Sequence, residues 1–474
     1  MKYLLILPGV LVLLMLIAVV RTLVSPRKTS GYQPPQTDEA EALRLAGKLS
    51  KMIQVDTTSH AGGDDPARFR AFHKTLAELF PRVFSQLEKT EIDGNLLFYW
   101  KGRSQERPIL LMSHQDVVPA EGAWSHAPFS GDIADGKVWG RGASDTKCSV
   151  MAFFEAAEQL LAEGYTPPTD VYLASSCTEE WAGDGAPKLV AELQRRGVEL
   201  FLVCDEGGAI ISEPIGGIPG NFAMVGVFEK GKADVKFTAK STGGHASAPK
   251  PHSPLVALSE ACTKIESHPF KAHVTKPVAE MFDTLGRYSN FTYRMIFANL
   301  WLFGDVLDSI CRKSGGELNA LMRTTVAFTQ AKGSAGRNVI PPEAAFISNL
   351  RLNPEDTMDS ALAYLKETIN DPAVEITKLE GMNPSRISET NCPAWDKVAS
   401  AVAGTWKGCL VAPYLMVQCS DSRHYGRISD HVYRFSAMDL TAEERGTLHG
   451  NNERIRVETV GRAVEFYVRL MRQC

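Results

Sequence analysis

The stretch Ile109-Leu110-Leu111-Met112-Ser113-His114-Gln115-Asp116 decides the fold, because an apolar run of strand length leads directly into polar residues that can carry chemistry. Short apolar runs without polar alternation are typical of strands that are buried on both faces of a sheet. Three other runs have the same character: residues 96–100, 171–174 and 200–203. Helix-like stretches at 146–163 and 186–196 lie between these runs. Strands that alternate with helices predict an α/β sheet with several parallel strands.

A second module is indicated from residue 222, where the order of the expected elements changes. These elements are, in chain order, strands at 222–228 and 233–240, a helix at 254–266, strands at 324–330 and 344–352, a helix at 356–369 and a strand at 374–379. A long irregular insertion at 268–322 interrupts them. This order predicts a separate βαβ-type module inserted in the first domain, to which the chain returns through residues 392–474.

The composition is that of an ordinary globular protein rather than a disordered one. The chain has 474 residues, of which 44% are hydrophobic and 22% charged, and this length suggests two or three domains. A formal net charge of -4 gives no electrostatic reason to expect nucleic acid as a partner. The nine cysteines show no paired CxxC spacing, which argues against a disulfide framework and against a cysteine zinc site.

The N-terminus carries an uncharged apolar run over residues 3–20. As a helix this run would reach about 27 Å, close to the roughly 30 Å of a bilayer's hydrocarbon core. The alternative is a cleaved signal peptide, whose apolar region usually has about 7–15 residues and ends at small residues. The longer run here exits into Arg21 without such a cleavage site, which favours a single-pass transmembrane anchor. The flanking charges, three basic residues over 21–28 against Lys2, favour a cytoplasmic body but leave the side of the membrane open.

Polar residues at the ends of the predicted strands are candidates for a functional site. Ligands gather at the carboxyl ends of strands in open α/β sheets, and His114 directly follows the strand at 109–112. Asp116 stands two residues later and could hold the imidazole tautomer from behind, although a surface histidine beside an aspartate is the commoner meaning of such a pair. Asp145 lies in a glycine-rich turn before a long helix, and its alternative role is that of an N-cap.

Two further strands lead into acidic residues. One precedes Glu179 and Glu180, and adjacent carboxylates at a buried strand end repel each other unless a cation or a proton separates them. Another precedes Asp205 with Glu206 beside it, and His449 stands far away in the sequence. Carboxylates and neutral imidazoles suit zinc, and a shared carboxylate suits two metal ions about 3.5–4 Å apart. A structural zinc site would more typically use cysteines, so the set favours a catalytic metal site.

Taken as an ordered set with these spacings, the motifs over residues 39–474 resemble the co-catalytic zinc peptidases that include carboxypeptidase S, aminoacylase and glutamate carboxypeptidase. The resemblance implies two Zn²⁺ ions per subunit, with ligands shared as follows: His114 and Asp205 on one ion, Glu180 and His449 on the other, and Asp145 between them. It also implies that Asp116 orients His114 and that Glu179 is the general base.

The resemblance extends to the inserted module and to nearby loops. Residues 243–247 match the family's glycine-histidine loop, so His245 would reach the partner's active site in a homodimer and stabilise the oxyanion there. The substrate-binding residues that the match implies are Asn338, Arg351, Asp421 and Arg423. The family pattern also implies a cis peptide bond between Asp145 and Thr146. Thr146 and Cys419-Ser420 depart from the usual family residues, so the substrate preference is harder to transfer.

Within the family, the N-terminal run, the insertion and the ending at 449–454 are most similar to carboxypeptidase S and to the enzymes that make and hydrolyse N-fatty-acyl amino acids. We therefore expect a zinc-peptidase catalytic domain with a mixed, largely parallel sheet, an inserted ferredoxin-like α+β lid and an N-terminal transmembrane helix. The expected segments are a membrane anchor at 1–25, a linker at 26–38, the catalytic domain at 39–228 and 383–474, and a lid or dimerisation domain at 229–382.

The expected activity is zinc-dependent hydrolysis of the amide bond in N-acyl amino acids or short peptides that bear a free C-terminal carboxylate. One alternative is a deacylase for another carboxylate-bearing amide metabolite. A second alternative is a catalytically silent binding protein on the same fold, against which an intact Glu179 argues, because such a protein needs no general base. The expected partners are the small substrate, a second copy of the chain and the membrane.

Overall fold

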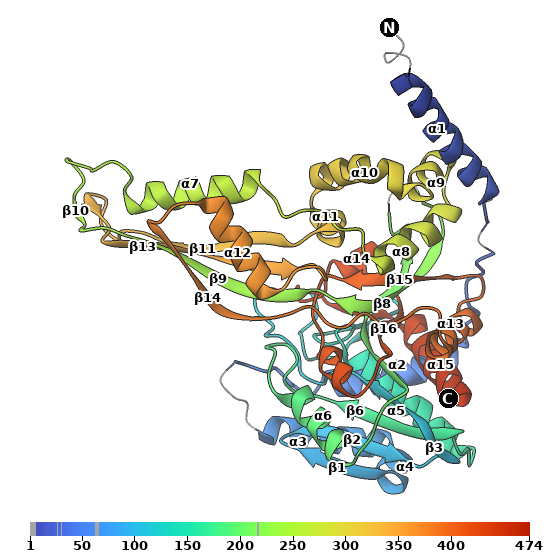
Figure 1. Cartoon of the computed structure of the whole chain (residues 1–474). Coiled ribbons are helices and arrows are strands. Elements are labelled where there is room, and N and C mark those ends of the chain that lie inside the picture. Colours follow the sequence, from blue (N-terminus) through green and yellow to red (C-terminus); the bar gives the residue numbers. More distant parts are fainter. Residues whose placement is uncertain (1–5, 26, 30, 62–65, 216–217) are drawn as a thin grey trace.

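A large mixed sheet forms the centre of the protein. In the computed structural model, which describes residues 6–25, 27–29, 31–61, 66–215 and 218–474, eight strands lie side by side (Figure 1). In spatial order they are β1 (Glu88–Ile92), β2 (Asn95–Trp100), β6 (Thr169–Ser175), β3 (Ser104–Met112), β7 (Leu202–Ser212), β16 (Val432–Asp439), β8 (Asn221–Glu229) and β15 (Leu410–Met416). The pairs β6–β3, β3–β7, β7–β16 and β8–β15 are parallel. This arrangement confirms the predicted α/β sheet with several parallel strands.

Helices cover both faces of this sheet, which explains the apolar runs in the sequence. They include α2 (Glu39–Ile53), α5 (Lys147–Ala162), α13 (Pro393–Thr405) and α15 (Val457–Gln473) on one face and α6 (Gly185–Arg195) on the other. In β3, Ile109 and Leu111 pack into the first core, whereas Leu110 and Met112 pack into the second. Successive residues of a strand point to opposite faces, so a strand covered on both sides needs an apolar residue at every position.

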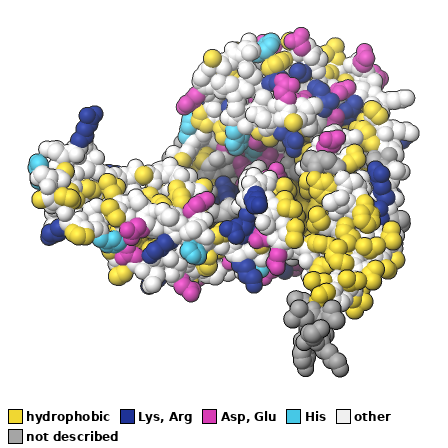
Figure 2. Space-filling view, turned by 90° about the horizontal axis from the view of Figure 1, so that it is seen from above, with side chains coloured by type: hydrophobic (Ala, Val, Ile, Leu, Met, Phe, Trp, Pro, Cys, Tyr) yellow, Lys and Arg dark blue, Asp and Glu magenta, His cyan; other side chains and the backbone are white. Residues whose placement is uncertain are grey.

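A second, antiparallel sheet forms an arm that projects from the body (Figure 1, Figure 2). Its elements follow one another as β9 (Gly231–Lys240), α7 (Pro254–Ser267), β11 (Thr325–Lys332), β13 (Glu343–Leu352), α12 (Met358–Ile369) and β14 (Val374–Met382). The strands lie in the order β11-β13-β9-β14 and share a small core with both helices. This β-α-β-β-α-β order is that of the expected ferredoxin-like lid.

Two small sheets complete the fold. At the tip of the arm, β10 (Gly244–His245) pairs with β12 (Val339–Ile340). A three-stranded sheet consists of β17 (Arg454–Arg456), β5 (Lys137–Trp139) and β4 (Ile133–Ala134). The β5–β17 pair is antiparallel and joins the first third of the chain to its end.

The insertion at 268–322 is helical, so the prediction of an irregular segment is wrong. It contains α8 (Lys276–Arg287), α9 (Phe291–Phe297), α10 (Leu300–Ser314) and α11 (Gly316–Met322). In α8, Val278, Met281, Phe282 and Leu285 are buried in the core of the larger sheet. Apolar residues at this three- and four-residue spacing form one face of a helix, so the pattern was present in the sequence.

The predicted single-pass membrane anchor, and with it the predicted membrane localisation, is wrong. Residues 3–5 of the predicted span lie outside the described residues, and the helix α1 covers Ile6–Val24. Within the described ranges, none of the helices combines the length and the apolar character that crossing a membrane requires.

The C-terminal turns of α1 pack against α9. Ala18 and Thr22 are buried, and the amide of Asn299 donates hydrogen bonds to the carbonyl oxygen of Ala18 and to the hydroxyl of Thr22, each at 3.1 Å. The guanidinium of Arg294 donates hydrogen bonds to the carbonyl oxygens of Thr22 and Ser25 at 2.7 and 2.6 Å. These carbonyl groups at the end of the helix have no partner within the helix itself. Hydrophobic side chains gather on the face around α1 (Figure 2).

Candidate metal centre

Segments that are far apart in the sequence converge on one polar centre beside the larger sheet. His114 follows β3, and Glu179 and Glu180 follow its parallel neighbour β6, so the carboxyl ends of two adjacent strands meet there. Asp145 stands two residues before α5 begins. His449 precedes β17. The pairing of β17 with β5 brings His449 close to Asp145, although the two residues are far apart in the sequence.

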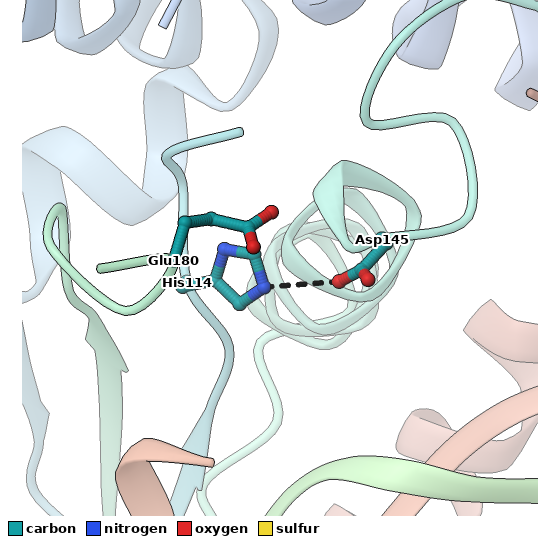
Figure 3. Close-up of side chains that lie close together, drawn as sticks. All are labelled: His114, Asp145 and Glu180. Carbon is teal, nitrogen blue, oxygen red and sulfur yellow. Dashed lines mark hydrogen bonds and ion pairs between the residues drawn. The ribbon is translucent and has the colours of Figure 1, made fainter. Parts of the chain in front are cut away.

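Asp145 lies between two histidines. Nε2 of His114 lies 3.1 Å from Oδ1 of Asp145 (Figure 3). Nε2 of His449 lies 3.1 Å from Oδ2 of the same carboxylate and 3.1 Å from Oε2 of Glu180. Two groups offer possible ligand atoms within 4.8 Å of one another: His114 with Asp145 and Glu180, and His114 with Glu179 and Glu206. The peptide bond from Asp145 to Thr146 is cis, which confirms the prediction.

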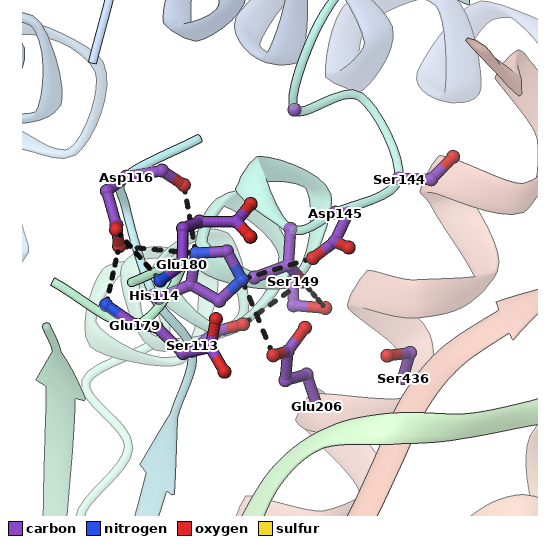
Figure 4. A network of polar contacts seen from close by, with 12 residues as sticks. Ser113, His114, Asp116, Ser144, Asp145, Ser149, Glu179, Glu180, Glu206 and Ser436 are labelled. Carbon is purple, nitrogen blue, oxygen red and sulfur yellow. Dashed lines mark hydrogen bonds and ion pairs between the residues drawn. The ribbon is translucent and has the colours of Figure 1, made fainter. Parts of the chain in front are cut away.

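Glu206, and not the predicted ligand Asp205, faces this centre (Figure 4). Oε1 of Glu206 lies 3.4 Å from Nε2 of His114. The buried carboxylate of Asp205 instead accepts hydrogen bonds from the backbone N–H groups of Glu206 and Ser422, at 2.8 and 2.9 Å. The structure therefore places Glu206 nearer to His114 than the predicted ligand Asp205, and the ligand role of Asp205 stays a prediction.

The two acids lie within β7 rather than after its end. The prediction ended the strand at Val203 and took Asp205, the first acidic residue after it, as the metal ligand. In the structure, β7 continues to Ser212. The pairing of β7 with β16 shifts register between Asp205 and Gly208, so regular strand alternation does not decide which of the two acids faces His114. The sequence pattern alone could not choose between them.

Asp116 supports the centre from behind. Its Oδ1 lies 3.4 Å from Nδ1 of His114, and its backbone carbonyl oxygen lies 2.9 Å from the same nitrogen. The carboxylate also accepts hydrogen bonds from the backbone N–H groups of Glu179 and Glu180 and from the hydroxyl of Ser59. Asp116 is fully buried. One carboxylate therefore orients both the imidazole of His114 and the turn that carries the two glutamates.

The carboxylates make the centre favourable for positive charge. Burial by itself lowers the pKa of His114, but its carboxylate neighbours outweigh burial and raise this pKa well above its usual value. Hydrogen bonds to Asp145 and Glu180 raise the pKa of His449 to about 10. Burial raises the pKa of Glu179 well above its usual value. These raised pKa values are expected where acidic groups crowd a buried site.

The side chains at the centre fit divalent metal ions. Imidazole nitrogens and carboxylate oxygens are the ligands that zinc takes in catalytic sites. Oε1 of Glu180 is buried and lacks a hydrogen-bond partner in the part of the chain that the structure describes. A buried carboxylate oxygen without a partner costs free energy unless a cation satisfies it.

The predicted lid residues lie away from this centre within one chain. His245 is exposed at the tip of the arm, where the carbonyl oxygen of Asn338 accepts a hydrogen bond from the backbone N–H of Ala246. Figure 1 shows this tip far from β3 and α5. Arg351 lies at the other end of β13, with Nη1 3.5 Å from Sγ of Cys419. The structure therefore separates Asn338 from Arg351.

Asp421 and Arg423 lie in a short 3-10 helix, Asp421–Arg427. The buried carboxylate of Asp421 contacts the hydroxyl of Ser176, and burial raises its pKa to about 7. Nη2 of Arg423 donates to the carbonyl oxygen of Asn383 at 2.6 Å, and its Nη1 lies 3.6 Å from Oε2 of Glu229. Contact of either residue with substrate stays a prediction.

Comparison with known proteins agrees with this site. The model of "Peptidase family M20/M25/M40" matches residues 110–473. The chain is 33% identical to "Probable carboxypeptidase S-like 2" of Dictyostelium discoideum, over 98% of this chain and 92% of that protein. It is also 33% identical to "N-fatty-acyl-amino acid synthase/hydrolase PM20D1" of Xenopus tropicalis, over 97% and 93%. The M20 family metallo-carboxypeptidase Sso-CP2 of Sulfolobus solfataricus has a similar fold, with a TM-score of 0.66 and 16% identity over 90% and 98% of the two chains.

The matched segment contains every residue of the centre, from His114 to His449. It also covers the arm and the loop that follows β15. The chain therefore belongs to peptidase family M20/M25/M40 and is a hydrolase of the metallo-carboxypeptidase and aminoacylase type.

Proposed function

We propose that this hydrolase cleaves the amide bond of N-acyl amino acids, or of short peptides, that bear a free C-terminal carboxylate, with two zinc ions per subunit. The observation that carries the proposal is the position of Asp145 between His114 and His449, with Glu179 close to His114. A shared carboxylate between two nitrogen ligands is the arrangement of two-metal hydrolases.

The proposed ligands are His114, Glu206, Asp145, Glu180 and His449. When bound, the metal ions supply Lewis acidity to the scissile carbonyl and make a water molecule more acidic. Glu179 accepts the proton of the attacking water and later delivers it to the leaving amine, a role worth about 10²–10⁴-fold in rate. A pKa raised by burial suits this carboxyl to both steps, because it can hold the proton between them.

Arg351 is the proposed anchor of the substrate carboxylate. Its guanidinium lies beside Cys419, in the loop that leads to Asp421, so it faces the catalytic domain rather than the tip of the arm. A guanidinium can bind a carboxylate through two parallel hydrogen bonds. The names of two relatives, a carboxypeptidase and an N-fatty-acyl-amino acid hydrolase, both imply a substrate with such a carboxylate.

Replacing Arg351 with alanine is expected to lower kcat/KM for an N-acyl amino acid by about 10²-fold, because charged hydrogen bonds contribute roughly 1.5–3 kcal/mol. The loss should be absent for the same substrate with its carboxylate converted to an amide. Steady-state kinetics on both substrates measure the effect, and Arg386→Ala, at an exposed arginine, is the matched control. Equal losses on the two substrates would contradict the assignment.

A cavity of about 670 Å³ next to the centre is the proposed site of the acyl group. Thr178 and Trp181 line it, and the two residues between them are Glu179 and Glu180. His424, three residues after Asp421, also lines the cavity. One turn of chain therefore serves both the metal centre and the cavity, whose volume is that of a typical small-molecule pocket.

Part of the lining of this cavity is apolar. Phe69 and Pro187 contribute this surface. The carboxylates of Asp93 and Asp184 share one lysine, Lys188, at 2.7 and 2.9 Å, so this group keeps a net negative charge. The proposal that the cavity holds an acyl chain therefore rests on the apolar side chains and on the position of the cavity beside Glu179 and Glu180.

Pro187→Trp, which would fill part of the cavity, is expected to lower kcat/KM for a dodecanoyl amino acid by about 10-fold. Each methylene group that no longer fits in a pocket costs roughly 1–3 kcal/mol of binding free energy. The acetyl amino acid should change by no more than about 2-fold. Ser259→Trp, on the outer surface of α7, controls for the added bulk. Equal losses for the long and the short acyl group would show that the cavity does not hold the chain.

His245 and Asn338 are proposed to act in a homodimer, each on the partner subunit's centre. They lie together at the tip of the arm, remote from the metal centre of their own chain. A two-fold dimer presents the same surface from both subunits, so each tip could reach the other's centre. His245 would then stabilise the oxyanion of the tetrahedral intermediate, and Asn338 would join Arg351 at the substrate.

The direct test is hydrolysis by the zinc-loaded protein of a panel of N-acyl amino acids, dipeptides and their C-terminal amides. We expect turnover of the free acids and little turnover of the amides. Zinc binding without turnover of any compound would favour a silent binding protein. Turnover of only other carboxylate-bearing amides would favour the alternative deacylase.

A further inference from the structure

Glu453 is a buried carboxylate that the proposed reaction does not use. Its Oε1 accepts hydrogen bonds from the backbone N–H groups of Ser144 and Asp145, at 2.8 and 3.0 Å. Its Oε2 accepts from the backbone N–H of Gly142 at 3.0 Å and from Nη1 of Arg141 at 2.8 Å. The residue has no exposed surface. Four donors from the segment that carries Asp145 therefore converge on one side chain.

The same side chain belongs to the segment that carries His449, four residues earlier. Arg141 completes the connection, since its Nη2 donates to the carbonyl oxygen of His449 at 3.3 Å. The backbone adds a further bond, from the N–H of Gly140 to the carbonyl oxygen of Glu453 at 2.9 Å. His449 has φ of 58°, a left-handed conformation that a residue other than glycine holds only when its surroundings impose it.

We infer that Glu453, with Arg141, is a positioning residue that holds Asp145 and His449 at the spacing required for metal binding. Asp145 and His449 reach the centre from segments far apart in the chain, and neither is placed by a regular element. The Glu453 carboxylate fixes one segment to the other through charge-assisted hydrogen bonds, which are stronger than neutral ones. The inference builds on the proposed metal centre.

The test compares Glu453→Gln with Glu158→Gln. Glu158 is a matched control, because its carboxylate is also buried and accepts from the backbone N–H groups of Arg82 and Val83 and from the Arg82 guanidinium, at the start of α4 (Pro81–Gln86). Zinc affinity is measured by competition with a chromogenic chelator, and the melting temperature is measured on the metal-free proteins. Both variants should lower the melting temperature, but only Glu453→Gln should weaken zinc binding, by about 10–100-fold.

Zinc affinity in Glu453→Gln that equals that of Glu158→Gln would overturn the inference. If Glu453→Gln does not fold, Arg141→Lys provides the same test, because it removes the planar fork that reaches both Glu453 and His449. Zinc binding to this second variant as tight as to the unmodified chain would overturn the inference as well. Failure of the unmodified chain to bind zinc would contradict the proposed function instead.

Discussion

Replacing Glu179 with glutamine is expected to lower kcat by about 10²–10⁴-fold while the protein keeps its metal ions. The amide has nearly the same shape as the carboxylate but cannot accept the proton of the attacking water. The backbone N–H of Glu179, which holds the turn to Asp116, is unaffected by the change. Metal content by atomic absorption and kcat by steady-state kinetics are measured on the same preparation.

Glu180→Gln is the matched comparison for this result. The two glutamates are neighbours on one turn, and both backbone N–H groups donate to Asp116. Glu180, however, contacts His449 and has a buried oxygen that is free for a metal ion. We expect its variant to lose metal affinity. Loss of metal in Glu179→Gln with retention in Glu180→Gln would reverse the two roles.

The sequence predicts the larger sheet well because its strands are buried on both faces. In β3 and β6 every position that pairs within the sheet is apolar over 109–112 and 171–174, so the runs are visible without knowledge of their partners. The polar residues that follow these runs, His114 and Glu180, lie where parallel strands end together. These two site residues could therefore be placed from local pattern alone.

Other features depend on contacts that no local pattern contains. His449 approaches Asp145 only because β17 pairs with β5. β17 has three residues, and nothing in them indicates which strand they pair with. Glu206 lies nearer to His114 than Asp205 does, at a point where the pairing of β7 with β16 shifts register. The apolar character of the N-terminal helix is visible in the sequence, whereas its contacts with Asn299 come from the middle of the insertion.

Activity should return when two inactive variants, His245→Ala and Glu179→Ala, are mixed under conditions that allow subunits to exchange. In a mixed dimer, one centre has its own Glu179 and receives His245 from the partner subunit, whereas the other centre lacks both. Random exchange makes half of the dimers mixed, so about one quarter of the centres should be complete. Each variant alone should be at least about 10²-fold less active, because one loses its general base and the other its oxyanion donor.

The measurement is kcat per total subunit before and after exchange, with exchange followed by native mass spectrometry of tagged chains. Ser247→Ala mixed with Glu179→Ala is the control. Ser247 contacts Nδ1 of His245 but cannot itself reach a scissile carbonyl, so the Ser247→Ala variant keeps the histidine that acts on the partner subunit. Verified exchange without recovered activity would contradict the action of His245 on the partner subunit, and so would a fully active monomer. Recovery would explain why the arm carries His245 and Asn338 so far from the metal ligands of its own chain, since the two ends of β13 would then serve two different centres.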